Sequence, residues 1–73
     1  MSSNLYTKEH KSIVGKLKKA RQEAGLDQVE VAKKLGRSQS YLSKIESGQR
    51  KIDVVQLKKF ATLYQKDINY FLK

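Results

Sequence analysis

This sequence contains no cysteine, proline or tryptophan among its 73 residues, and only one histidine. Without cysteine no disulfide forms, and a single histidine leaves no cluster with the spacing of a structural metal site. A chain this short buries only about 60% of the surface that its unfolded form exposes, so helix packing or a partner must hold it together. The length allows one small domain and excludes a two-domain enzyme.

Long apolar runs are missing as well. No segment approaches the roughly 18 apolar residues of a membrane span, and residues 1–6 lack the apolar stretch of a signal peptide. We therefore expect a cytosolic protein that makes no membrane contact. One histidine and seven scattered acids supply no Ser-His-Asp, Cys-His or paired-carboxylate arrangement, so we expect no enzyme, no metal and no cofactor.

Acidic residues are scarce, because 7 Asp and Glu stand against 16 Lys and Arg, giving a formal net charge of +9. Self-repulsion at this charge density destabilises a compact chain, and a polyanionic partner would offset it. A lysine-rich surface made only for solubility is the alternative. Charge alone does not decide between the two.

Three glycines divide the chain into short helical segments. Gly25, Gly36 and Gly48 each follow an apolar-periodic segment, where the end of a helix favours a left-handed residue. Asp27 and Asp53 each begin a capping box, because Glu or Gln follows three residues later. No strand-like alternation or internal repeat interrupts this pattern. The sequence predicts an N-terminal tail (1–6) and a single all-α domain (7–73) with helices at about 7–24, 28–35, 39–46, 54–64 and 68–72.

Periodicity in the first and third predicted helices indicates which side faces inward. The first helix carries its apolar residues on one stripe: Ile13, Leu17, Ala20 and Ala24. In the third helix the period points Leu42 and Ile45 inward. Its outward side is polar without dense charge, which suits the edges of bases better than a surface made for solubility. These outward residues are Gln39, Ser40, Ser43, Lys44 and Ser47.

Two short helices joined by Gly36 and Arg37, the second polar on its free side, predict a helix-turn-helix of the DNA-binding type. Its motifs are Leu17-x-x-x-Arg21, Gly25-Leu-Asp-Gln-Val-Glu-Val-Ala32, Leu35-Gly36 and Ser38-Gln-Ser-Tyr-Leu-Ser-Lys-Ile-Glu46-x-Gly48. With these motifs the chain resembles the phage repressor and Cro (XRE-type) family over residues 13–72 or so. The resemblance implies a compact five-helix, lambda-repressor-like DNA-binding domain.

The resemblance also implies roles for individual residues. It places residues 39–46 in the major groove, the groove that admits a helix and distinguishes all four base pairs. The expected base contacts are Gln39, Ser40, Ser43 and Lys44. The expected phosphate contacts are Arg21, Gln28, Arg37, Tyr41, Ser47, Arg50 and Lys51. The residues expected to hold the motif together are Ala32, Gly36, Leu42, Ile45, Glu46 and Gly48.

Some of these roles have an alternative. The resemblance pairs Arg21 with Glu46, so that loss of Glu46 would change stability and not base preference; the alternative is two unrelated surface charges. Gln28 is expected beside a phosphate and beside Gln39, or is simply tolerated at the start of its helix. The Tyr41 ring either packs on the second helix or reaches DNA.

The chain departs from the family pattern most clearly at Gln65, where a glycine often ends the fourth helix. Because a side chain disfavours the left-handed conformation, we expect that turn to be strained or frayed. The departure concerns the C-terminal geometry and not the function.

The expected function is that of a sequence-specific double-stranded DNA-binding transcriptional regulator, in the form of a repressor at a palindromic operator. The resemblance implies a bacterial or phage-encoded homodimer whose two half-sites lie about one helical turn, 34 Å, apart. The alternative is an antitoxin-like module that uses the helix-turn-helix to dock a toxin or another regulatory protein. The expected dimer contact is Tyr64, Ile68, Tyr70, Phe71 and Leu72, unless these residues only close the core of the monomer.

Overall fold

Five helices follow one another along residues 7–73, the part of the chain that this computed structural model describes. They are α1 (Lys8–Glu23), α2 (Gln28–Leu35), α3 (Gln39–Glu46), α4 (Val54–Leu63) and α5 (Ile68–Leu72). No strand occurs in this range, which confirms the all-α prediction, and no helix in it is long and apolar enough to cross a membrane. The helix limits differ from the predicted ones by at most one residue; the predicted tail, 1–6, lies outside the described residues.

Each helix begins at a residue whose side chain caps it. At the start of α2, the Asp27 carboxylate accepts from the backbone N–H of Glu30, and the Glu30 carboxylate accepts from that of Asp27. The same reciprocal box joins Asp53 and Gln56 at the start of α4. A cap of this kind stabilises a helix by about 1 kcal/mol. Single side-chain caps begin the other three helices, from Thr7, Ser38 and Asp67.

The first four helices end with the same turn, in which one residue adopts the left-handed conformation. These residues are Gly25, Gly36, Gly48 and Gln65. The space beside Gly36 is empty, so the backbone conformation and not a close neighbour favours glycine there. Gln65, with a φ of 57°, is the one non-glycine residue of positive φ in the described range. The turn at Gln65 is therefore formed but strained, at a cost of about 1–2 kcal/mol.

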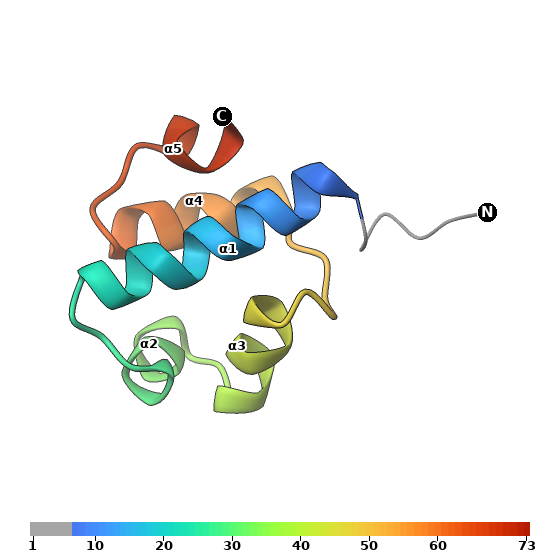
Figure 1. Cartoon of the computed structure of the whole chain (residues 1–73). Coiled ribbons are helices and arrows are strands. Elements are labelled where there is room, and N and C mark those ends of the chain that lie inside the picture. Colours follow the sequence, from blue (N-terminus) through green and yellow to red (C-terminus); the bar gives the residue numbers. More distant parts are fainter. Residues whose placement is uncertain (1–6) are drawn as a thin grey trace.

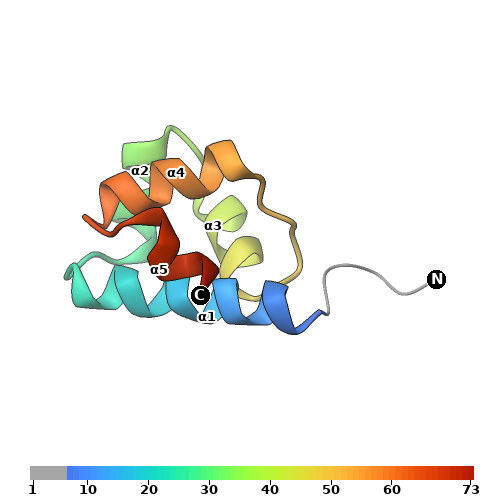
Figure 2. The same ribbon diagram turned by 90° about the horizontal axis from the view of Figure 1, so that it is seen from above.

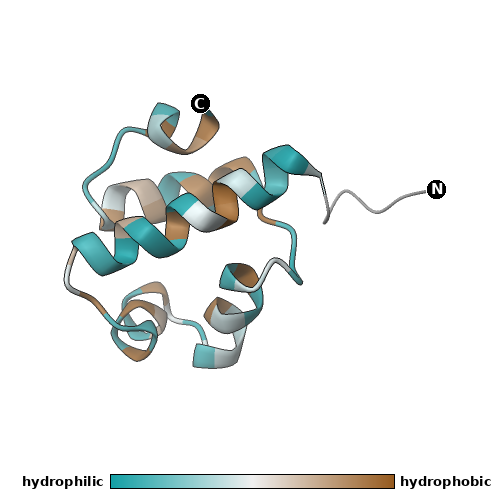
Figure 3. Ribbon diagram, in the orientation of Figure 1, coloured by the Kyte–Doolittle hydropathy of each residue, from teal (hydrophilic) through white to brown (hydrophobic). Residues whose placement is uncertain are grey.

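Helix α1 runs across the middle of the molecule, with α2 and α3 along one side of it and α5 along the other (Figure 1). Seen from above, α5 lies between α1 and α4 and contacts both (Figure 2). Hydrophilic residues cover much of the outward side of α1 (Figure 3). Buried side chains from all five helices meet in one core: Leu17, Ala20, Val31, Tyr41, Leu42, Ile45, Leu57, Phe60, Ala61, Tyr64 and Phe71.

The buried stripe of α1 is rotated from the predicted one. Leu17 and Ala20 are buried as expected, but Ile13 is only partly buried and Ala24 is exposed. Ala24 is the C-cap, where the chain already leaves the helix. The observed stripe is His10, Val14, Leu17, Ala20 and Arg21.

The C-terminal helix completes the core. Phe71 is fully buried and Tyr64 is 4% exposed, so neither presents apolar surface to a second copy of the chain. Both side chains therefore close the core of the monomer, which was the alternative to a dimer contact. Tyr70 and Ile68 are partly buried, and Leu72 remains 57% exposed.

Candidate nucleic-acid interface

The helix-turn-helix consists of α2, residues 36–38 and α3. Ala32 on α2 is buried, as are Leu42 and Ile45 on α3, which agrees with their expected structural role. The turn between the helices is closed by the Arg37 backbone N–H, which donates to the Ala32 carbonyl over 2.9 Å. The left-handed Gly36 permits this turn. Local sequence thus fixes the position of α3 relative to α2.

Helix α3 turns one polar side to solvent. All four expected base contacts are exposed there: Gln39, Ser40, Ser43 and Lys44. Gln39 and Ser43 are four residues apart, as are Ser40 and Lys44, so these two neighbouring rows together form one side of the helix. In Figure 1, α3 lies at the edge of the molecule farthest from α5. An α-helix with its side chains is about 10–12 Å across, which matches a major groove about 12 Å wide.

Arg21 and Glu46 form a buried, two-pronged ion pair between α1 and the end of α3. Arg21 donates from Nε to Glu46 Oε2 over 2.7 Å and from Nη2 to Glu46 Oε1 over 3.1 Å. Only 11% of the Arg21 side chain and 3% of the Glu46 side chain are exposed. The hydrogen bond to Glu46 raises the pKa of Arg21, against the opposing effect of burial. The predicted pair is confirmed, and the alternative of two unrelated surface charges is wrong.

The same geometry corrects the expectation that Arg21 contacts a phosphate. Its third nitrogen, Nη1, donates to the carbonyl of Leu26 over 2.9 Å. Each guanidinium nitrogen is thus engaged inside the protein. Arg21 instead holds α1 against the helix-turn-helix.

Two glutamine side chains extend this ion pair to the outward side of α3. Gln28 donates from Nε2 to Glu46 Oε1 over 3.1 Å, and Gln39 donates from Nε2 to Gln28 Oε1 over 3.5 Å. The predicted contact between Gln28 and Gln39 is therefore present. We call Arg21, Glu46, Gln28 and Gln39 the Arg21–Gln39 network. It connects the buried Arg21, near the end of α1, to Gln39, the first residue of α3.

Tyr41 packs into the protein, which was one of the two positions left open for it. The residue is 8% exposed, and its hydroxyl accepts a hydrogen bond from Gln56 Nε2 over 2.8 Å. The guanidinium groups of Arg37 and Arg50 lie over its ring, 4.5 Å and 5.0 Å from the ring centroid. A cation on an aromatic ring contributes about 0.5–1 kcal/mol at an exposed site. Tyr41 therefore packs beneath Arg37 and Arg50, two of the expected phosphate contacts.

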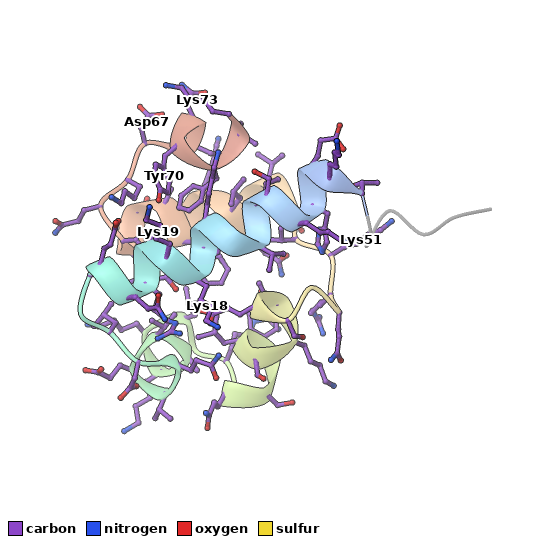
Figure 4. All side chains as sticks on the ribbon, viewed as in Figure 1. Lys18, Lys19, Lys51, Asp67, Tyr70 and Lys73 are labelled. Atoms are coloured by element: carbon purple, nitrogen blue, oxygen red, sulfur yellow. The ribbon has the colours of Figure 1, made fainter. Side chains whose placement is uncertain are left out.

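Basic side chains flank the outward side of α3. Arg37 precedes the helix, and Arg50 and Lys51 follow it in the next loop; all three are exposed. An open hollow of about 360 Å³ brings Arg37 and Arg50 together with Ser40 and Lys44. Figure 4 shows Lys51 in the loop after α3. This arrangement places cations where an anionic backbone would pass beside a helix in the groove.

Ser47 stands at the C-cap of α3, where its hydroxyl donates to the carbonyl of Lys44 over 3.1 Å. Gly48 follows with the left-handed conformation expected of it. The end of α3 is thus completed by local contacts.

Positive charge is not confined to this side of the molecule. Lys18 and Lys19 are exposed on α1 (Figure 4), and Lys58 and Lys59 are exposed on α4. Charge by itself therefore does not distinguish this side of the molecule from the others. Within the described residues, no group of three His, Cys, Asp or Glu side chains gathers in a way that could hold a metal.

Two supporting contacts were not predicted from the sequence, that of His10 with Gly48 and that of Gln56 with Tyr41. His10 is 8% exposed, and its Nε2–H donates to the carbonyl of Gly48 over 3.3 Å, which ties the first turn of α1 to the turn after α3. Its position four residues before Val14 on the buried stripe is the signal that could have revealed it. The contact between Gln56 and Tyr41 spans two helices and leaves no such signal.

Comparison with known proteins identifies the family. No curated protein matches this chain significantly. The sequence model of a helix-turn-helix family, HTH_3, matches residues 17–71. That range begins inside α1, contains α2, α3 and α4 in full, and ends inside α5. Because the match covers most of the chain and includes both helices of the motif, the protein belongs to the XRE-type helix-turn-helix family of DNA-binding regulators.

Proposed function

We propose that this protein is a sequence-specific transcriptional repressor that binds a palindromic operator with α3 in the major groove. The observation that carries the proposal is the outward side of α3, which is polar, exposed and held from behind by the Arg21–Gln39 network. Four side chains able to donate or accept hydrogen bonds face one direction on a helix of groove-fitting size. Occupation of the operator would exclude polymerase from it.

The proposal divides the interface into residues that read bases and residues that hold the backbone. Gln39 can bond N6 and N7 of an adenine together, whereas Arg37, Arg50 and Lys51 meet phosphates that are alike on every sequence. Ser40, Ser43 and Lys44 complete the base-reading side. Sequence specificity would come from the base-reading residues of α3, and the salt-dependent part of the affinity from the basic residues Arg37, Arg50 and Lys51 at its two ends.

A homodimer is part of the proposal, because one short helix reads only a few base pairs. The remaining candidates for its contact are Ile68, Tyr70 and Leu72, which keep exposed area outside the core. Sedimentation with and without a duplex of two half-sites tests the dimer. A strict 1:1 complex on that duplex would contradict it.

The test of sequence reading begins with selection of bound duplexes from a random library. Gln39→Ala should then cost about 1–3 kcal/mol on the selected site, and far less once the corresponding base pair is changed. Lys51→Ala is the control, since it should weaken binding to all sequences alike and reduce the slope of log affinity against log salt by about one unit.

A uniform loss of affinity with Gln39→Ala would mean that α3 does not read bases through this residue. If the protein is retained on heparin but selects no DNA sequence, the alternative of a protein-docking module replaces the proposed repressor function.

A further inference from the structure

Chemistry imposes one direction on the Arg21–Gln39 network. A guanidinium only donates hydrogen bonds and a carboxylate only accepts them. The Gln28 atom that lies 3.1 Å from Glu46 Oε1 must therefore be its amide nitrogen. Gln28 then turns its carbonyl oxygen toward Gln39, which can meet that oxygen only with its own amide nitrogen.

We propose that Glu46 is a positioning residue that sets which way the Gln39 amide faces and thereby which base pair α3 reads there. This inference rests on the proposed function and adds to it a buried side chain that touches no base. It also differs from the expectation drawn from the sequence, in which loss of Glu46 changes stability and not base preference.

Burial makes this direction hard to reverse. Only 3% of the Glu46 side chain is exposed to solvent. Because little water screens its charge, the carboxylate interacts more strongly with the atoms bonded to it than it would at the surface. If Gln28 were turned over, its carbonyl oxygen would face the carboxylate and two acceptors would meet without a proton. A buried acceptor left in that way costs about 1–3 kcal/mol, more beside a charge.

The fixed direction has a consequence at the base edge. Gln39 uses one N–H on Gln28 and keeps the second N–H and its carbonyl oxygen, with the nitrogen on the Gln28 side. The order of donor and acceptor along the groove is then set before DNA arrives. A·T and T·A pairs present the adenine N7 acceptor and N6 donor in opposite orders, so a fixed amide favours one of them, whereas a free amide could turn to suit either.

The first experiment uses the free protein and no DNA. Side-chain amide order parameters, measured by NMR relaxation on 15N-labelled protein, should show Gln39 more restricted than the exposed glutamines Gln22 and Gln49. In Glu46→Gln, the Gln39 amide should become as mobile as these two controls. Equal mobility of all three in the parent protein, or no change at Gln39 in the variant, would overturn the proposal.

The second experiment measures base discrimination on the selected operator and on duplexes with single base pairs exchanged, including A·T for T·A. The parent should discriminate about tenfold or more at the pair that Gln39→Ala identifies. Glu46→Gln should reduce that ratio to about twofold and leave the ratios at the pairs read through Ser43 and Lys44 unchanged. When Gln39 is already replaced by Ala, adding Glu46→Gln should not reduce the discrimination ratio at the Gln39 base pair any further.

Gln28→Leu gives a second route to the same answer, because it breaks the network and leaves the ion pair in place. This variant should melt within a few degrees of the parent and lose discrimination at the same base pair. It therefore tests the network even if Glu46→Gln fails to fold.

The possible results separate the two proposals. If Gln39→Ala alters no base preference, reading through Gln39 fails, and with it the basis of this inference. If Gln39→Ala removes one preference and neither Glu46→Gln nor Gln28→Leu affects it, only the role of Glu46 is wrong. A loss of discrimination spread equally over all base pairs would show a general loosening of α3 and would also overturn that role.

Discussion

Two regions of this molecule, the end of α3 and the end of α4, bury polar groups and differ in how these groups are bonded. Where α1, α2 and α3 meet, the buried Arg21 and Glu46 bond each other, Leu26 and Gln28. Tyr64, the C-cap of α4, buries its hydroxyl within reach of the charges of Arg21 and Glu46, yet this hydroxyl has no hydrogen-bond partner in the described part of the chain. Burial raises the pKa of Tyr64, because removal from water disfavours the charged phenolate more than the neutral phenol.

The backbone follows the same contrast. The turn after α3 uses Gly48, whereas the turn after α4 places Gln65 in the left-handed conformation. Apolar and aromatic side chains surround the end of α4 instead, where Phe60 and Tyr64, four residues apart, have a ring-centroid distance of 5.8 Å. The comparison shows that hydrogen bonds are complete at the side chains that position α3, whereas the end of α4 keeps an unbonded hydroxyl at Tyr64 and a strained backbone at Gln65. Three substitutions test this contrast.

Glu46→Ala should have the largest effect. It leaves the Arg21 charge buried without its carboxylate, so the free energy of unfolding should fall by about 3–5 kcal/mol. Denaturant and thermal unfolding measure this loss. Glu23→Ala is the matched control, because the Glu23–Lys66 ion pair of 3.1 Å is much more exposed and should contribute less than about 1 kcal/mol. Similar losses in both variants would show that the buried ion pair of α3 contributes no more to stability than an exposed one.

Gln65→Gly should act in the opposite direction. Glycine adopts a positive φ without strain, so the free energy of unfolding should rise by about 1 kcal/mol. Gln49→Gly makes the same exchange at a residue that is not in the left-handed region, where added freedom of the unfolded chain should destabilise the protein slightly. A loss of stability in both variants would show that Gln65 is not strained.

Tyr64→Phe should have the smallest effect at neutral pH. It removes a buried hydroxyl without a partner, so stability should stay equal or rise by up to about 1 kcal/mol. The pKa of Tyr64 is higher in the folded than in the unfolded state. Below about pH 10 the tyrosine is neutral in both states, but as the pH rises further it ionises first in the unfolded chain, which lowers the parent's free energy of unfolding. The advantage of the phenylalanine variant should therefore grow above pH 10.

Stability curves from pH 7 to 11 measure this difference. Tyr70→Phe, at a partly buried tyrosine, controls for loss of a hydroxyl as such. If the two variants follow the same pH dependence, the burial of the Tyr64 hydroxyl has no special effect.

Local signals predicted the helices well, because caps and turns act over a few residues. The capping boxes at Asp27 and Asp53 and the left-handed glycines are read directly from neighbouring positions. The buried side of α1 was harder. Ala24 lies four residues after Ala20 and so fitted the same stripe by its period, although the helix ends before it, and the buried His10 was missed.

At the site, the resemblance supplied the Arg21–Glu46 pair and the Gln28–Gln39 contact, which the structure contains. The hydrogen bond from Gln28 to Glu46 was not foreseen, since it joins residues 18 positions apart through tertiary packing. The aromatic residues at the C-terminal end show the same limit. Sequence alone did not distinguish an exposed contact from a side chain that completes the core, as Phe71 does.

The two arginines over Tyr41 have one further consequence, which concerns conformational entropy. A free arginine side chain loses up to about 2 kcal/mol of rotamer entropy when it is fixed. Arg37 and Arg50 already rest on a ring that Gln56 holds in place. Their planar faces lie against the ring while the N–H groups at their edges remain available. Much of the ordering that a phosphate would otherwise have to impose is thus complete before any ligand arrives.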